Sequence, residues 1–340
     1  MEVTLKDIAR ECNVSFSTVS KALKNSSEIS QKTIDLVNKT AKRMGYHTNA
    51  AARALRINKT YSIGVIFEDI TGSGLQHQYF AKIFDSINVH ANKSGYNITF
   101  LSQNSNQSYL AQAKYRRCDG VIIVSTNFYR EDVQALLTSN IPLSMLDYKD
   151  NYNHSSIMSD NRTGIRVITE KIIENGHKKI AFIHGEESDV TKLRMTSFKQ
   201  TMKKYGIEIC KEYIKEAIYH DPETSFKATE QLLQEKAPPT CIIYPDDFAA
   251  LGGIQALAKH GYTPGQNISI AGYDGILIST LLTPKLTTYQ QDAKELGKQL
   301  VVQLLANIEF PETFKSETIK VSGHLLAGSS IMNLLQPGAF

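Results

Sequence analysis

The chain has 340 residues, 41% of them hydrophobic, which is enough for two or three domains with sizeable cores. Its formal net charge is only +4, yet residues 1–60 carry 11 Lys and Arg against 5 Asp and Glu, a local net charge of +6. Subtraction from the totals leaves 27 basic and 29 acidic residues in 61–340, a net charge of −2. This asymmetry indicates a small polyanion-binding head on a near-neutral body, and the alternative is a solvated basic face.

The cysteines and the N-terminal residues argue against a secreted or membrane protein. Four cysteines lie far apart, at Cys12, Cys118, Cys210 and Cys241, and they fit neither a disulfide framework nor a CxxC metal site. We expect buried thiols in a reducing cytosol. The opening residues MEVTLKDIAR lack the apolar region of a signal peptide, and no run approaches membrane-spanning length. The sequence predicts a soluble, cytoplasmic protein with no membrane partner.

Three short helices are predicted in the basic head. The segment TLKDIARECNV has apolar residues at helical spacing, with Thr4 as its N-cap. After a turn at residues 13–14, Ser15 can cap a second helix, and Ser30 can cap a third that stops at Gly45. The second helix leaves the following residues on its outer side: Phe16, Ser17, Ser20 and Lys21. Such helices sharing one core form a helix-turn-helix unit, whose second helix can enter the major groove of DNA.

From Tyr61 onward, short apolar runs alternate with helical patterns. Runs such as YSIGVIF, GVIIVS, KIAFIH and ISIAGY are continuous and rich in β-branched residues, as buried parallel strands are. We expect helices over residues 78–94, 130–139, 161–175, 191–205, 224–236 and 247–260. Two such series of similar length predict an α/β core of two doubly wound lobes, each a parallel sheet covered on both faces.

Polar residues that directly follow the apolar runs mark the candidate ligand site. Ligands of open α/β sheets bind beyond the carboxyl ends of the strands. The polar residues at these positions are Glu68, Asp69, Ser125, Asp147, His184, Asp246, Asp247 and Asp274. Several carboxylates are therefore expected to converge on one cleft.

Five motifs follow one another in an order typical of one protein family. They are TLKDIARECNVSFSTVSKALKN, GYHTNAAARALR, IENGHKKIAFI, DDFAALGGIQALAKHGYTPGQNISIAGYDG and PKLTTYQQD. With these motifs the chain resembles the lac repressor/galactose repressor family of bacterial transcription regulators from Thr4 to about Ile331. The resemblance implies an all-α helix-turn-helix head on a two-lobed, periplasmic-binding-protein-like α/β core.

The resemblance also implies a division of the chain. The DNA-binding domain is expected in residues 1–48, a hinge helix or linker in residues 49–60, and an effector-binding and dimerisation core in residues 61–340. Within the core, the first lobe is expected at about 61–158 and 290–320. The second lobe is expected at about 159–289 and 321–335.

The family's pattern assigns DNA contacts to the second helix and the hinge. Base reading falls to Phe16, Ser17 and Lys21, although many relatives carry Arg where Lys21 stands, and Lys cannot make the bidentate contact to guanine. In the hinge, Leu55 matches the family's apolar wedge in the minor groove. A helix this short is unstable alone and should order only when two copies pack on DNA. The residues expected at DNA are Thr4, Ser15, Phe16, Ser17, Thr18, Ser20, Lys21, Asn25, Asn49, Arg53, Leu55 and Arg56.

The resemblance also supplies an effector site, in which carboxylate and guanidinium groups would bind the hydroxyls of a sugar. Arg194 is the expected anchor. Asp246 stands where relatives usually carry Asn, which admits a polyol, an amino sugar or a ligand bound with a cation. The aromatic platform of relatives near Glu223 is absent, which argues against a stacked purine, and Phe248 or Phe128 could supply a ring instead. The residues expected at the effector are Asp69, Ser125, Asp147, Arg194, Asp246, Phe248, Asp274 and Gln291.

Other kinds of site lack their sequence motifs. The nine histidines include no HExxH, no HxH and no Cys neighbour, so we expect no metal site. The segment GVIFEDITGSG lacks the GxGxxG spacing of dinucleotide sites, and neither a GxSxG elbow nor a Walker A motif occurs. We therefore expect no cofactor and no enzymatic activity.

These observations predict a DNA-binding regulator, a repressor of carbohydrate-related genes controlled by a sugar-like small molecule. We expect a homodimer on a palindromic operator, because one short recognition helix reads too few base pairs. Two alternatives stay open. One is control by a phosphocarrier protein, for which the basic segment KYRRC at 114–118 is a candidate surface. The other is a sugar-binding transport receptor, against which the basic head and the missing signal peptide argue.

Overall fold

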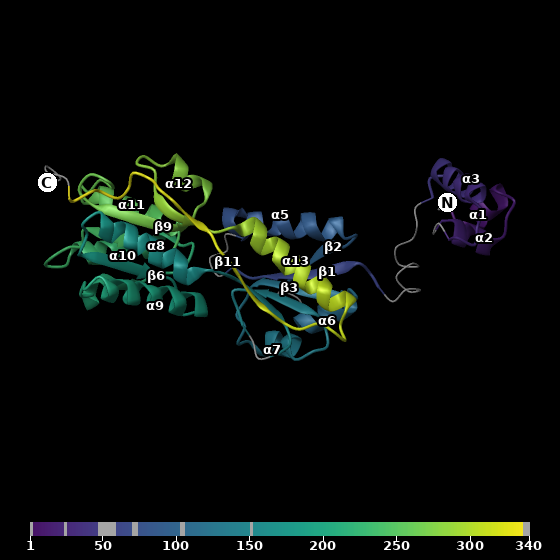
Figure 1. Ribbon diagram of the computed structural model, residues 1–340, viewed down its shortest axis with the longest axis horizontal. Coiled ribbons are helices and arrows are strands. Elements are labelled where there is room, and N and C mark those ends of the chain that lie inside the picture. The colour runs from purple at the N-terminus through teal and green to yellow at the C-terminus, as the bar shows by residue number, and fades with distance from the viewer. Residues whose placement is uncertain are drawn as a thin grey trace. The chain divides into compact units, whose positions relative to one another are not determined.

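Figure 1 shows the computed structural model of the chain, which describes residues 3–23, 26–46, 59–69, 74–102, 106–149 and 152–335. The chain divides into two compact units, Met1–Thr60 and Tyr61–Phe340. Each unit has its own hydrophobic core. Within the described ranges, no helix is long and apolar enough to span a lipid bilayer.

The described part of the first unit contains the helices α1 (Leu5–Glu11), α2 (Phe16–Ala22) and α3 (Gln31–Arg43). Each begins after a hydroxyl side chain that accepts a hydrogen bond from a backbone N–H of the first turn, at Thr4, Ser15 and Ser30. Asp7 completes a capping box with Thr4. All three helices contribute to one small core, which consists of Ile8, Ala9, Cys12, Val19, Ala22, Ile34, Val37 and Ala41.

The second unit contains two six-stranded sheets. The spatial order of the first is β11 (Thr318–Val321), β5 (Ser155–Ser159), β4 (Leu143–Leu146), β3 (Gly120–Ser125), β1 (Ser62–Phe67) and β2 (Asn97–Leu101). The spatial order of the second is β12 (His324–Leu326), β10 (Thr287–Gln290), β9 (Ser269–Asp274), β8 (Cys241–Ile243), β6 (Ile180–His184) and β7 (Ile214–Glu216). Neighbouring strands are parallel, except that β12 runs antiparallel to β10.

Helices cover both faces of each sheet, and we call each sheet with its helices a lobe. In the first lobe, α5 (Gln78–Lys93) and α13 (Ala293–Glu309) lie side by side over one face, as Figure 1 shows. The opposite face packs against α6 (Tyr109–Tyr115) and α7 (Glu131–Leu137). In the second lobe, α10 (Pro222–Leu233) and α11 (Ala249–Lys259) cover one face, and α8 (Asn161–Glu174) and α9 (Asp189–Lys204) cover the other. This arrangement confirms the predicted pair of doubly wound lobes.

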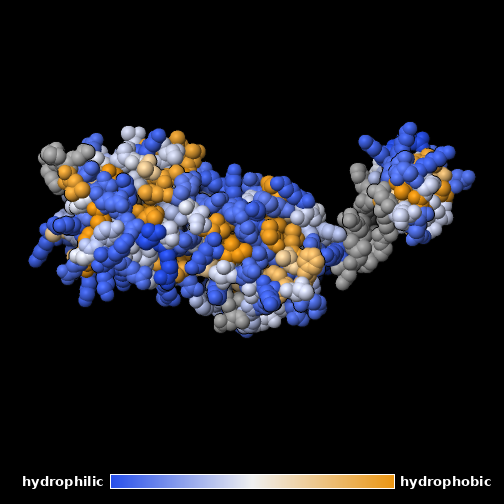
Figure 2. Space-filling model, in the orientation of Figure 1, coloured by the Kyte–Doolittle hydropathy of each residue, from blue (hydrophilic) through white to orange (hydrophobic). Residues whose placement is uncertain are grey.

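Three short connections join the lobes, after β5, after β10 and after β11. Short elements complete the described chain: α12 (Leu277–Leu281) and the 3₁₀ helices η1 (Gly74–Gln76) and η2 (Lys211–Tyr213). The visible surface of the second unit is largely hydrophilic, with hydrophobic residues in scattered groups, as Figure 2 shows. The parallel strands of both lobes end toward a space between them, where a ligand site is expected.

Candidate functional site

A cavity of about 680 Å³ lies between the two lobes. Strand ends and the loops after them supply most of its lining, as expected for doubly wound sheets. Six of the residues predicted at the effector line this cavity: Asp69, Ser125, Asp147, Arg194, Asp274 and Gln291. A volume of this size suits a small molecule of sugar or nucleoside dimensions.

Two residues predicted at the effector do not line the cavity. The carboxylate of Asp246 is 1% exposed, and its Oδ1 accepts hydrogen bonds from the backbone N–H groups of Phe248 (2.9 Å) and Ala249 (2.8 Å) at the start of α11. Phe248 is 36% exposed and meets the ring of His77 edge-on. Asp246 was expected in the cavity as a polar residue after β8, but its carboxylate binds backbone N–H groups at the start of α11, and Phe248 was expected there as a ring for the ligand.

Arg194, on α9, is the buried cation of the cavity. Its Nε donates to Oδ1 of Asn161 (2.7 Å), its Nη1 donates to the carbonyl of Pro245 (2.8 Å), and its guanidinium lies 3.6 Å from the centre of the Tyr273 ring. Burial disfavours the charged form, but neighbouring groups, Tyr219 first, raise the pKa above its ordinary value. The side chain is thus a fixed, charged donor whose position is set by three neighbours.

Asp147 and Asp274 face this cation from the first and second sheets. Both have left-handed backbone conformations, with φ of 51° and 95°, directly after β4 and at the end of β9. Burial raises the pKa of each carboxyl to about 6. Oδ1 of Asp274 accepts a hydrogen bond from Nε2 of Gln291 (2.6 Å). Within the described part of the chain, Oδ2 of Asp274 and Oε1 of Gln291 have no partner, so both are available to a ligand.

Aromatic rings also line the cavity, and of the two rings that the sequence offered, Phe128 is in the lining and Phe248 is not. Phe128 stacks on Tyr148 with ring centres 3.8 Å apart and an interplanar angle of 4°. Tyr219, also in the lining, places its ring 5.4 Å from the guanidinium of Arg194. Tyr219 lies only four residues before the exposed Glu223, near which we expected no aromatic platform, and Phe128 and Tyr148 come from the first lobe.

The remaining strand-end residues have structural roles. Glu68 lines the cavity, but its carboxylate is paired with Arg130 (2.6 Å) and accepts hydrogen bonds from Thr126 and Tyr109. Asp247 is fully buried and accepts from the backbone N–H of Ile276 (2.9 Å). The carboxylate of Glu68 therefore braces loops of the first lobe, and that of Asp247 holds the loop after β9, although Oδ1 of Asp247 has no partner among the described residues.

The predicted DNA-binding residues of the head lie at the start of α2 and on its outer side. Phe16 is 52% exposed, and Ser17 and Lys21 are also exposed. Ser15 caps the helix, and its Oγ lies 2.8 Å from Oγ1 of Thr18. Lys21 forms an ion pair with Glu28. Thr4 is in the capping box of α1, and Ser20 is half-buried. Five predicted residues lie outside the described ranges: Asn25, Asn49, Arg53, Leu55 and Arg56.

Many residues of the cavity could not be assigned to it from the sequence, Tyr219 and His220 among them. Tyr219 and His220 follow the short strand β7, whose sequence IKE has no apolar run to mark it. A short, half-exposed edge strand carries little sequence signal, so the loop after it could not be placed at the sheet's carboxyl end.

A helix-turn-helix unit joined to a two-lobed α/β core that encloses a polar cavity defines a class of transcription regulators with a ligand-binding core. Comparison with known proteins agrees. Residues 4–49 match the model of bacterial regulatory proteins of the lacI family, and residues 169–331 match the model of periplasmic binding protein-like domains. The chain belongs to the lacI family of bacterial regulatory proteins.

Relatives match over the full length. The chain is 32% identical to the HTH-type transcriptional repressor PurR of Actinobacillus pleuropneumoniae serotype 3 (strain JL03), over 97% of this chain and 99% of that protein. It is 30% identical to PurR of Haemophilus influenzae (strain PittEE), over 98% and 99% respectively. The crystal structure of the lac repressor dimer bound to operator and the anti-inducer ONPF has a TM-score of 0.83 at 26% identity, covering 98% of this chain and 100% of that chain.

Proposed function

We propose that the chain is a transcriptional repressor that binds a palindromic operator as a homodimer and is controlled by a small molecule in the inter-lobe cavity. The observation that carries the proposal is the cavity itself, where Arg194 faces Asp147 and Asp274, in a chain that also has a helix-turn-helix head. The lac repressor, similar over the full length, was crystallised as a dimer on its operator with an anti-inducer. Binding to an operator would place the protein in the cytoplasm.

The polar groups of the cavity favour a ligand with several hydroxyl groups, such as a sugar or a sugar derivative. A carboxylate accepts two hydroxyl donors in one plane, and a guanidinium donates to ring or hydroxyl oxygens. Asp147 and Asp274 can supply the acceptors, and Arg194 can supply the donor. Oε1 of Gln291 adds a further unpaired acceptor, among the described residues, beside Asp274.

A purine base or nucleoside is the second candidate, and the aromatic lining favours it. The rings of Tyr219 and of the stacked pair Phe128 and Tyr148 can pack on a planar base. The carboxylate of Asp274 can accept two N–H groups along one edge of such a base. The proximity of rings and acceptors supports this class as well as the sugar class, so one screen should contain both.

Control of DNA binding would follow from the coupling between two sites. A ligand that brings the lobes together would move the first lobes of a dimer relative to each other. That movement changes the distance between the two hinge segments, in which Asn49, Arg53, Leu55 and Arg56 are proposed to contact DNA. The cost of ordering those segments on the operator would then change without any contact between ligand and DNA.

A thermal-shift screen of the full-length protein tests the proposal. Sugars, sugar phosphates, purine bases and nucleosides are each added to the wild type and to Arg194→Met. A ligand of the native state raises the melting temperature of the wild type with its concentration, and it should not do so in the variant. The hit is then added to the protein on a palindromic duplex from the DNA beside its coding region. An unchanged affinity for that duplex would refute ligand control.

A further inference from the structure

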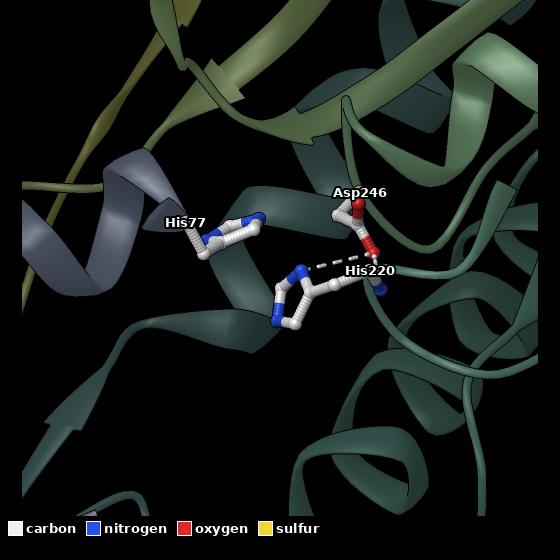
Figure 3. Close-up of side chains that lie close together, drawn as sticks. All are labelled: His77, His220 and Asp246. Carbon is white, nitrogen blue, oxygen red and sulfur yellow. Dashed lines mark hydrogen bonds and ion pairs between the residues drawn. The ribbon is translucent and has the colours of Figure 1, made fainter. Parts of the chain in front are cut away.

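Three side chains from distant parts of the sequence meet at the boundary of the two lobes, as Figure 3 shows. They are His77, which directly precedes α5 in the first lobe, and His220 and Asp246, which lie in the second lobe. The two imidazole rings have centres 3.8 Å apart and are inclined by 49°. One ligand atom from each of the three residues lies within 4.8 Å of the others. His77 is near the other two residues only because the first lobe contacts the second.

The cluster is buried, and part of its hydrogen-bonding capacity is unused. His77 is 4% exposed, and neither of its ring nitrogens has a hydrogen-bond partner among the described residues. Nδ1 of His220 lies 3.5 Å from Oδ2 of Asp246, so that imidazole already has a carboxylate beside it. Buried ring nitrogens are nearly always bonded, because an unpaired polar atom loses its hydration without compensation. Both ring nitrogens of His77 can therefore bind a group other than the described residues.

We propose that His77, His220 and Asp246 bind a first-row transition metal ion of the Zn²⁺, Co²⁺ or Ni²⁺ type, which ties the first lobe to the second. Two imidazoles and a carboxylate are a common ligand set for such ions, whereas Mg²⁺ and Ca²⁺ prefer oxygen ligands alone. At bond lengths of about 2.0–2.1 Å, tetrahedral ligand atoms lie about 3.3 Å apart. The three ligand atoms lie within 4.8 Å of one another, so the side chains must rotate to bring them to this distance around one ion.

The surroundings suit a cation in two respects. The carboxylates of Asp69 and Asp274 add negative charge around His220, beyond that of Asp246. The carboxylate of Asp246 is also fixed, because it accepts hydrogen bonds from the backbone N–H groups of Phe248 and Ala249, at the start of α11, and from that of His220 at 2.8 Å. A carboxylate and an imidazole held this way are preorganised ligands. The three protein ligands leave a fourth coordination position for water or a further donor.

The spacing of histidines in the sequence could not reveal this site. His77 and His220 lie in different lobes and belong to no HExxH or HxH motif and have no Cys neighbour, which is why no metal was expected. Contacts beside the cluster hold the lobes in register: the backbone N–H of Leu277 donates to Oε1 of Gln78, the residue after His77. An ion at this boundary would add to those contacts.

Calorimetric titration of the full-length protein with ZnCl₂, after treatment with a chelator, tests the inference. All proteins carry Cys210→Ser, because that exposed thiol lies beside Glu212 and could bind zinc by itself. We expect one ion per chain, and a loss of affinity of at least about 100-fold in His77→Phe and in His220→Asn. Phe keeps the ring that packs against Phe80. CoCl₂ should show the absorption of a four- or five-coordinate ion, and MgCl₂ should show no binding.

The control is His260→Gln, which removes an exposed histidine that also faces a carboxylate, Glu230 at 3.3 Å. This variant should bind zinc like the parent protein. The inference is overturned if the parent protein does not bind zinc, or if folded His77→Phe and His220→Asn bind it as tightly as the parent. A loss of zinc affinity in His260→Gln alone would also overturn the inference, because the ion would then bind at the surface. Titrations contain neither DNA nor effector, so the metal site and the proposed function can fail separately.

Discussion

The guanidinium carbon of Arg194 lies over the ring of Tyr273, 3.6 Å from its centre. Gly164 on α8 makes room for that ring, since a Cβ at position 164 would lie 2.2 Å from the Tyr273 hydroxyl. The ring and the two acceptors of Arg194, Asn161 and Pro245, set the position of the only charged donor that we propose for the ligand. Packing in the second lobe therefore determines the geometry of the cavity.

Gly164→Ala should destabilise the core and weaken the response to the effector. The added methyl group would displace Tyr273, at a cost of roughly 1–3 kcal/mol, which exceeds the gain in helix propensity. Urea denaturation and the ligand-induced shift in melting temperature measure the two effects. In a Tyr273→Leu background the same substitution should cost less, because the clash is removed. Equal costs in the two backgrounds would contradict the packing argument.

Asp147→Asn should stabilise the ligand-free protein at neutral pH. Burial raises the pKa of Asp147 to about 6 from the ordinary 3.8, against the hydrogen bond from Ser159 and the charge of Arg194. The folded protein therefore keeps this proton to a higher pH than the unfolded chain. Ionisation of Asp147 therefore lowers the free energy of unfolding. The loss is complete above pH 6 and absent below about pH 4. The variant should gain about 1–3 kcal/mol in free energy of unfolding at pH 7.5, and less as the pH falls.

Urea denaturation of Asp147→Asn and the wild type at pH 7.5 and pH 4.5 measures this dependence. Asp85→Asn, on the exposed side of α5, is the matched control and should change stability little at either pH. A destabilised Asp147→Asn at pH 7.5, or a gain that does not vary with pH, would show that burial does not govern this carboxyl.

Glu28→Gln should tighten operator binding. Lys21, which we propose to contact DNA, forms an ion pair with Glu28 in the free head. The substitution frees the Lys21 ammonium and removes a nearby negative charge, and both changes favour contact with phosphates. Together they should raise the operator affinity roughly two- to five-fold. Anisotropy of a labelled palindromic duplex at several salt concentrations measures the change. Lys21→Gln should weaken operator binding and lower its salt dependence. If the operator affinity of Lys21→Gln equals that of the wild type, Lys21 does not contact DNA.

Leu55→Ala should weaken operator binding by more than about ten-fold, since an apolar wedge between base steps is lost. Leu55→Met, which keeps an apolar side chain of similar length, should retain most of the affinity. Ligand-induced stabilisation should be the same in both variants as in the wild type, because the cavity lies in the core. Equal affinity of the alanine variant and the wild type would refute the wedge.

Regular elements could be predicted because their patterns are local. Thr4, Ser15 and Ser30 marked helix starts through a single side chain each, and the long β-branched runs marked buried strands. The helix α13 was not predicted although its pattern is local, since Asp292 caps it and Leu296, Leu300 and Leu304 repeat at helical spacing. The strand β7, in contrast, has neither length nor apolar alternation, and such a strand depends on tertiary contacts rather than on propensity.

Residues of the candidate site could be predicted where they lie at strand ends. Residues that come together only because the two lobes meet could not be predicted. Asp147, Arg194 and Asp274 reach the cavity as the topology and the family resemblance indicate. The orientation of the Asp246 carboxylate depends on its hydrogen bonds to the backbone N–H groups of Phe248 and Ala249, which the start of α11 positions. The pairing of His77 with His220 depends on the contact between two lobes, which no pattern within one lobe encodes.

Ligand binding in the cavity and operator binding by the head are proposed to be coupled. Isothermal titration of the screened ligand into the full-length protein, free and saturated with operator duplex, measures this coupling. Operator should change the ligand's Kd by the same factor by which the ligand changes the operator's Kd. Identical ligand Kd values with and without operator, for a ligand that occupies the cavity, would contradict it.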